Sequence, residues 1–156
     1  MTRLLQAGRG VQIMLVAGVL LIADSFLDWQ RVEFGLGRLG SGSVSANAWD
    51  DFLGAMMGLL AIALVVWVVT RLAGVELPTS VSHATVCLLL SALVFGLALA
   101  KVLTNDYVTW AGYAGAALAA LLVVGAVLEV RSESRARDGG TVASDITDEP
   151  STGAGA

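Results

Sequence analysis

Four aspartates are the residues of this chain whose type and spacing best suit ligand binding. Asp24 and Asp28 lie four residues apart, and Asp50 and Asp51 are adjacent, at the two ends of one polar stretch. Carboxylate oxygens are the ligands that Ca²⁺ prefers, and about six to eight oxygens complete its shell. The spacing matches no EF-hand loop, and two arginines in the same stretch supply counter-charge, so helix capping and solvation are the favoured roles. A cation site stays open as the alternative.

His83 and Cys87 form a second pair with metal-ligating side chains, four residues apart. The chain has one histidine and one cysteine, so two ligands are all that these types supply, and no intrachain disulfide can form. No serine–histidine–aspartate spacing and no basic patch with interleaved aromatics is present. The sequence therefore predicts no metal at His83 and Cys87, and it predicts no cofactor, no enzymatic activity and no nucleic-acid partner; outside the open question of the aspartates, no metal is expected.

The composition of the chain indicates a lipid environment. Of its 156 residues, 56% are hydrophobic and 14% are charged, against about 45–50% and about 25% in ordinary globular chains. Four apolar stretches have about the length that crosses a bilayer, namely residues 11–27, 52–72, 84–103 and 107–130. Lipid offers no partners to backbone groups, so such stretches must be helices. We expect an all-α membrane protein, an antiparallel four-transmembrane-helix bundle within residues 1–130.

The distribution of basic residues predicts the orientation. With four spans, six of the nine lysines and arginines fall on one side of the membrane, namely Arg3, Arg9, Arg71, Arg131, Arg135 and Arg137. The positive-inside rule then places both termini in the cytoplasm of a cell whose plasma membrane holds the chain. Residues 131–156 have few large apolar side chains, which predicts a disordered cytoplasmic tail. A cleaved secretory signal over residues 1–23 is a competing interpretation, and its poor cleavage site favours a retained helix.

The polar stretch at residues 28–51 becomes the first outer loop in this arrangement. Trp29 and Trp49 lie near its ends, where amphipathic rings favour the membrane–water boundary, so we expect membrane anchors, with ligand binding as the alternative. Together with Asp28, Asp50 and Asp51 they are our candidates for an interaction on this loop. Partial alternation at residues 30–34 and 43–46, around a glycine-rich centre, predicts a short β-hairpin.

Two isolated opposite charges lie at matching depth near the outer end of the bundle. Asp24 is about one turn inside the first span, and Lys101 is close to the end of the third. Charges inside a membrane usually face the bundle interior and find a partner. We therefore expect an ion pair between Asp24 and Lys101 at the outer rim.

Small residues at intervals of four predict where helices approach closely, because helices in lipid gain little from apolar burial. The rows lie on three of the four spans. They are Gly54 and Gly58; Ala92, Gly96 and Ala100; Ala111, Gly115 and Ala119; and Gly112, Ala116 and Ala120. Packing within the bundle is the favoured role. The fourth span, with two adjacent rows, is our candidate for contact with another protein.

Two short motifs resemble those of a known group. The stretches Ser25-Phe-Leu-Asp-Trp29 and Ser45-Ala-Asn-Ala-Trp49-Asp-Asp-Phe52 are similar to the first outer loop of small actinobacterial membrane proteins with four spans and no assigned activity. Asp28 stands where proline is common in that group. The resemblance covers roughly residues 11–72 and implies four helices and a plasma-membrane location, without a function.

Two functions remain open from the sequence. The first is a non-enzymatic accessory or scaffold subunit that binds another membrane protein, or a second copy of itself, through the fourth span or the outer loop. The alternative is a small oligomeric transporter or channel. A permeation path needs polar residues at mid-membrane depth, and Ser91 is the main one there. The first function is therefore favoured.

Overall fold

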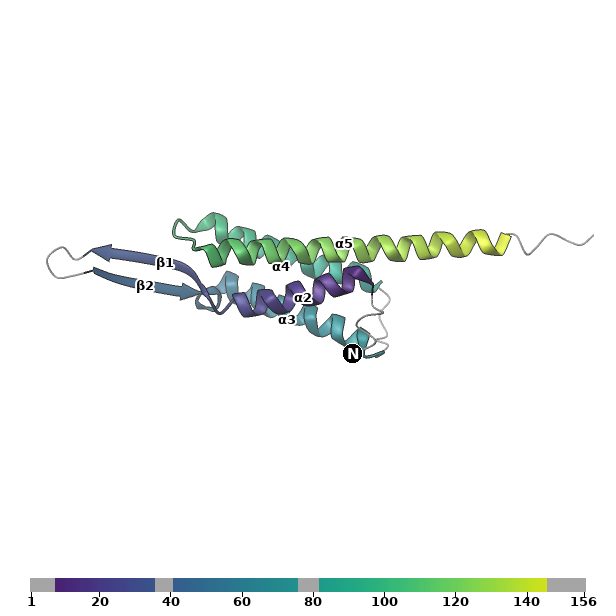
Figure 1. The fold of residues 1–156 in the computed structure, drawn as a ribbon, viewed down its shortest axis with the longest axis horizontal. Helices are drawn as coiled ribbons and strands as arrows, with labels where there is room; N and C mark the ends of the chain where they lie inside the picture. Colours follow the sequence, from purple (N-terminus) through teal and green to yellow (C-terminus); the bar gives the residue numbers. More distant parts are fainter. Residues whose placement is uncertain (1–7, 36–40, 76–81, 146–156) are drawn as a thin grey trace, which may run out of the picture.

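The computed structural model describes residues 8–35, 41–75 and 82–145. Its elements, in chain order, are α2 (Arg9–Asp24), β1 (Asp28–Gly35), β2 (Ser41–Asn47), the 3₁₀ turn η2 (Ala48–Asp50), α3 (Phe52–Leu72), α4 (His83–Thr104) and α5 (Trp110–Asp145). The helices lie along a common direction, and the β1–β2 hairpin extends from one end of them (Figure 1). We call this the hairpin end of the bundle.

Three of these helices are long and apolar enough to cross a membrane. They are α3, α4 and the part of α5 from Trp110 to Ala136. The expected first span, α2, has 16 residues, which at about 1.5 Å per residue give about 24 Å, below the roughly 30 Å of a hydrocarbon core. The chain is thus a helical membrane protein with three helices of spanning length in its described part.

The boundaries of α5 differ from the prediction at both ends. The helix begins at Trp110, three residues later than expected, and continues to Asp145. The prediction of a disordered tail is therefore wrong for residues 131–145, while residues 146–156 lie outside the described residues. A helix that is already formed adds one hydrogen bond for each residue it fixes, so a polar continuation needs no apolar burial to form.

The two strands form the predicted hairpin. They pair antiparallel, with Val32 opposite Val44, Phe34 opposite Gly42 and Arg31 opposite Ser45. Alternation places Val32, Phe34 and Val44 on one face of the hairpin, because strand side chains alternate between faces. The turn at residues 36–40 lies outside the described residues.

The small residues of α3 and α5 leave room for residues of the outer loop as well as for neighbouring helices. A Cβ on Gly54 would collide with the Ala48 carbonyl, and one on Gly58 would lie 2.7 Å from the Trp49 ring. On α5, Gly112 and Gly115 are buried against Trp29. The GxxxG of the second span therefore accommodates the returning loop.

The row on α4 is used differently from the other rows. Ala92 and Gly96 are exposed, and a Cβ on Gly96 would meet nothing within 4 Å, while Ala100 is half-buried. On α5, in contrast, Ala111 and Ala119 are buried and Ala116 and Ala120 are half-buried. The rows on α5 are therefore used largely within the bundle, and contact of the fourth span with another protein stays a prediction. The small residues left open are those of α4.

Candidate functional site

Trp29 is buried between α2 and α5 at the hairpin end of the bundle. Its side chain is 1% exposed, its Nε1 donates to the Asp24 backbone oxygen at 3.1 Å, and its ring lies against Gly115. The prediction of a membrane anchor at Trp29 is therefore wrong, because the base of the hairpin folds this ring between α2 and α5. A large ring fits there because α5 carries glycine at residue 115.

Trp49 joins the loop to the end of α2. Its Nε1 donates to Ser25 Oγ at 2.9 Å, and its ring stacks on Phe26 with centroids 5.7 Å apart. The Ala48 amide donates to the Ser25 carbonyl at 3.1 Å. Ser25 is fully buried, so one serine at the end of α2 receives both the backbone and the side chain of the returning loop.

Three of the predicted loop aspartates have separate local partners. Asp50 Oδ2 accepts from the Asn47 amide at 2.7 Å, completing a capping box at η2. Asp51 Oδ1 accepts from the Gly54 amide at 2.7 Å and so caps α3. Asp28 pairs with Arg31 at 3.1 Å. The described residues hold no group of three or more metal-ligating side chains, so capping and pairing account for these carboxylates.

Lys101 does pair at the rim, but with a different aspartate from the one predicted. Its Nζ lies 2.7 Å from Asp51 Oδ2, 3.3 Å from the Ala48 carbonyl and 5.8 Å from the centroid of the Trp29 ring. The expected Asp24–Lys101 pair is therefore wrong. Lys101 lies at the end of the bundle, as its position in the sequence predicts. The η2 turn brings Asp51, at the start of α3, to this ammonium.

Asp24 itself is buried at the junction of α2 and α5. Its Oδ2 has no hydrogen-bond partner in the described part of the chain, and a Cβ on Gly115 would lie 2.6 Å from that oxygen. The carboxyl group is thus held inside the bundle, and no ion pair joins it to a cation of the described residues. The backbone oxygen of Asp24 accepts a hydrogen bond from Trp29 Nε1 and so joins α2 to the base of the hairpin.

The residues before α5 fasten the base of the hairpin. The Arg31 amide donates to the Tyr107 carbonyl at 3.2 Å, and the Thr109 amide donates to the Trp29 carbonyl at 2.9 Å. Gln30 and Val108 form an antiparallel bridge. Residues 107–109 therefore fix β1 to the start of α5 through an isolated β-bridge and two backbone hydrogen bonds, and they do not form the first turn of a span.

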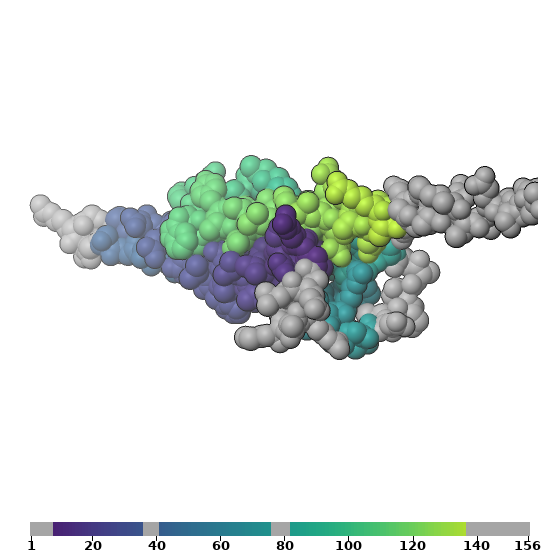
Figure 2. Space-filling model, turned by 45° about the vertical axis from the view of Figure 1, so that its right-hand side comes forward, coloured from purple at the N-terminus to yellow at the C-terminus, as the bar shows by residue number. Residues whose placement is uncertain are grey.

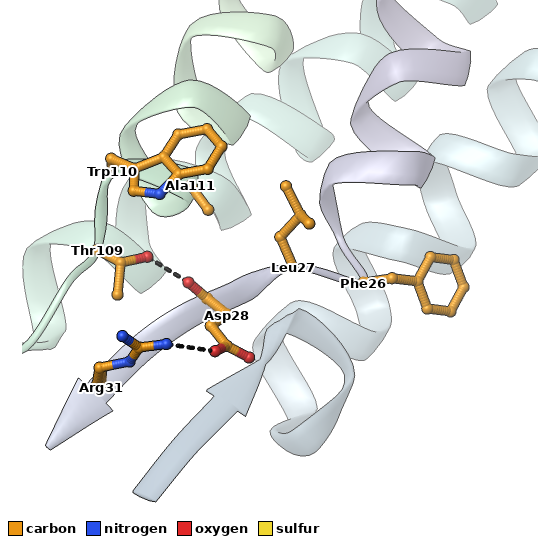
Figure 3. A pocket seen from close by; sticks show the side chains of 7 residues that line it. All are labelled: Phe26, Leu27, Asp28, Arg31, Thr109, Trp110 and Ala111. Carbon is orange, nitrogen blue, oxygen red and sulfur yellow. Dashed lines mark hydrogen bonds and ion pairs between the residues drawn. The ribbon is translucent and has the colours of Figure 1, made fainter. Parts of the chain in front are cut away.

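A pocket, which we call the rim pocket, opens beside Thr109. It has a volume of about 370 Å³. Its residues come from the end of α2, the start of β1 and the start of α5; they are Phe26, Leu27, Asp28, Arg31, Thr109, Trp110 and Ala111 (Figure 3). Thr109 Oγ1 donates to the Asp28 carbonyl and closes one side. Apolar and charged side chains thus share one concave site at the end of the helices.

A β-bulge sets the charged side of this pocket. The register shifts between Asp28 and Gln30, so Trp29 is an extra residue on β1. Side chains three residues apart on a regular strand point to opposite faces, and a bulge re-aims them. Asp28 and Arg31 therefore meet at the rim pocket (Figure 3).

The other end of the bundle carries an ion-pair cluster that the sequence reasoning missed. Arg71 Nη1 lies 3.5 Å from Glu133 Oε1 and 3.9 Å from Glu129 Oε1, which joins α3 to α5. Glu129 is buried beside Gly10, where a Cβ would lie 3.2 Å from Glu129 Oε2. Glu129 is an isolated charge near the end of the fourth span, as Lys101 is near the end of the third, and this position is the sequence signal for the cluster.

His83 and Cys87 contact each other at the same end. Cys87 Sγ lies 3.4 Å from His83 Nε2, and the imidazole stacks on Trp67 with ring centroids 5.8 Å apart. The pair packs α4 against α3. Ser91, the polar residue at mid-membrane depth, donates from Oγ to the Leu88 carbonyl at 3.0 Å, within its own helix.

Comparison with known proteins gives no match for this chain among protein-family models, curated proteins or solved structures.

Proposed function

We propose that this chain is a non-enzymatic accessory or scaffold subunit of a plasma-membrane complex, which presents its outer hairpin to a partner protein. Four helices would cross the membrane with both termini in the cytoplasm. A short α2 is compatible with this arrangement because the bilayer thins around a short span at modest cost. Contacts of α2 with α3 and α5 along the bundle support its placement among the spans (Figure 1).

The observation that carries the proposal is an apolar hairpin face that stands clear of the helices. Val32, Phe34 and Val44 are exposed, with 61% of Val44 accessible. The hairpin protrudes beyond the ends of the helices in the space-filling view (Figure 2). Six residue steps separate Trp29 from Gly35, which at about 3.3 Å each place the end of β1 about 20 Å from the rim.

That reach takes the hairpin beyond the lipid. A bilayer of about 40–45 Å with a core of about 30 Å leaves roughly 5–8 Å of headgroups on each side. The apolar face therefore stands in water, where contiguous exposed apolar residues mark interaction sites. An isolated hairpin is marginal in water, and among the described residues its backbone support from residues 107–109 reaches as far as Arg31. A partner that covers Val44 would stabilise the outer half.

The alternative of a transporter or channel has less support. The polar groups inside the bundle are concentrated near its two ends, as the Lys101–Asp51 and Arg71–Glu133 pairs illustrate. Ser91 bonds its own helix. A chain of polar side chains through the middle of the bundle is what a permeation path would require.

The test compares the same substitution on the two faces of β2. Val44→Asp places a charge on the apolar face, and Ser43→Asp places it on the opposite, polar face beside Glu33. Tagged full-length variants are extracted in mild detergent, and the protein that co-elutes with the unmodified chain is quantified. We expect Val44→Asp to reduce that protein at least tenfold and Ser43→Asp to leave it nearly unchanged. Equal recovery with both variants, or solute flux through reconstituted vesicles without any co-eluting protein, would overturn the proposal.

A further inference from the structure

The rim pocket lies where the helices end, at the level of the lipid headgroups. Trp110 is the first residue of α5 and is 73% exposed, and Leu27 lies just after the end of α2. Tryptophan at a helix end favours the boundary between hydrocarbon and water. Lipid headgroups are therefore the molecules that this pocket meets at highest concentration.

The pocket is divided between apolar and charged surfaces. Leu27, Trp110 and Ala111 form its apolar side, while Asp28 and Arg31 form the charged side near the hairpin (Figure 3). Its volume of about 370 Å³ falls within the range of about 300–1,000 Å³ that small-molecule sites occupy. The division suits an amphiphile whose polar group faces the hairpin and whose glycerol portion faces the helices.

The charged side chains of Asp28 and Arg31 indicate which polar group the ligand carries. Asp28 Oδ2 and Arg31 Nη2 lie 3.1 Å apart, and both side chains are about half exposed. Exposed ion pairs contribute little to stability, so this pair exchanges partners at small cost. A guanidinium binds phosphate through two parallel hydrogen bonds, and a carboxylate accepts from an ammonium. A ligand that carries both charges close together replaces the internal pair with two ionic hydrogen-bonded contacts.

We propose that the rim pocket binds the headgroup of an aminophospholipid, with its phosphate on Arg31 and its primary ammonium on Asp28. A purely anionic headgroup would be repelled by Asp28, and a quaternary ammonium has no N–H to donate to the carboxylate. A soluble phosphate ester with an amine shares the charged chemistry. The apolar side formed by Leu27 and Trp110 is the reason that we assign the lipid.

The experiment measures lipid retained by the full-length protein in mild detergent by native mass spectrometry. The protein is mixed with equal amounts of dioleoyl phosphatidylethanolamine, phosphatidylglycerol and phosphatidylcholine. We expect at least fivefold more phosphatidylethanolamine on the protein than either other lipid. Arg31→Gln should reduce this retention at least fivefold, and Asp28→Asn should abolish the preference over phosphatidylglycerol. Arg135→Gln, an exposed arginine of α5 with the same charge change, is the matched control and should bind as the unmodified chain does.

Several results would overturn the proposal. Retention of phosphatidylglycerol equal to that of phosphatidylethanolamine removes the role of the ammonium, and equal behaviour of Arg31→Gln and Arg135→Gln removes the pocket. Displacement of the lipid by millimolar soluble phosphoethanolamine assigns the site to a soluble ester. Both pocket substitutions are at exposed side chains, so folding is checked by a single elution peak and unchanged circular dichroism. Loss of the co-eluting partner in Val44→Asp leaves this test unaffected, because the two surfaces are separate.

Discussion

Replacing Asp51 and Lys101, singly and together, tests the arrangement at the hairpin end most directly. The Lys101 side chain is 2% exposed, whereas that of Asp51 is 40% exposed. The ammonium bonds Asp51 at 2.7 Å and the Ala48 carbonyl at 3.3 Å. The two residues therefore depend on each other unequally, because a half-exposed carboxylate can be hydrated and a buried ammonium cannot.

Asp51→Asn is expected to be the more damaging single change. It keeps the side-chain oxygen that caps α3 at Gly54 but leaves a buried cation without counter-charge. Removing one partner of a fully buried pair costs about 3–5 kcal/mol, and the exposure of Asp51 favours the lower limit, about 3 kcal/mol. Lys101→Met leaves Asp51 hydrated and removes one donor from Ala48, for which about 1–2 kcal/mol is expected.

The double variant supplies the decisive value. Without the ammonium, the charge at residue 51 has no buried partner, so Asp51→Asn with Lys101→Met should be about as stable as Lys101→Met alone. The two effects then fall short of additivity by the whole cost of Asp51→Asn, about 3 kcal/mol. Free energies of unfolding are measured by titrating dodecyl sulfate into maltoside micelles while tryptophan fluorescence is recorded.

A parallel cycle with Asp24→Asn separates the observed pair from the one expected from sequence. Asp24 has no contact with Lys101 among the hydrogen bonds and ion pairs of the described residues, so its substitution should be additive with Lys101→Met. If Asp24 couples to Lys101 and Asp51 does not, the reasoning about this end of the bundle is refuted.

Two further substitutions test how Trp29 is accommodated, each with a matched control in the same unfolding assay. Gly115→Ala is expected to destabilise by about 1–3 kcal/mol because its Cβ would collide with the Trp29 ring, while Gly96→Ala, which meets nothing within 4 Å, should change stability by about 0.5 kcal/mol or less. Trp29→Phe removes the donor to Asp24 and should cost about 1–3 kcal/mol, whereas Trp110→Phe, at an exposed ring, should cost about 0.5 kcal/mol or less. Equal effects within either pair would contradict the burial of Trp29.

Hydrophobic runs and alternation were sufficient to predict α3, α4 and the hairpin. Residues 52–72 were expected as a span, and α3 covers these same residues. Residues 84–103 became α4 with one residue more at each end. Both predictions depend on hydropathy over about 20 residues, which needs no knowledge of neighbours. The paired strands followed in the same way from a period of two.

The partners at the rim could not be predicted because depth along a helix does not give direction around it. Asp24 and Asp51 both fall near the end of the bundle where Lys101 lies, and only the η2 turn decides between them. The burial of Trp29 could not be predicted for a related reason. A tryptophan at a boundary position is compatible with lipid and with burial alike, and residues 107–109 settled the matter by pairing with β1.

Polar contacts at the hairpin end select one arrangement of the helices, which apolar packing in lipid does poorly. Apolar helices in a bilayer gain similar van der Waals contact in several rotations about their axes, and a buried ion pair adds little stability while it can select one arrangement. The Lys101–Asp51 pair fixes α4 against the start of α3, and Trp29 fixes β1 against α2 and α5. These contacts hold the hairpin at one angle to the helices. A protein that served only as a lipid-facing bundle would gain nothing from a fixed hairpin, whereas a subunit that presents Val44 to a partner at a set height depends on it.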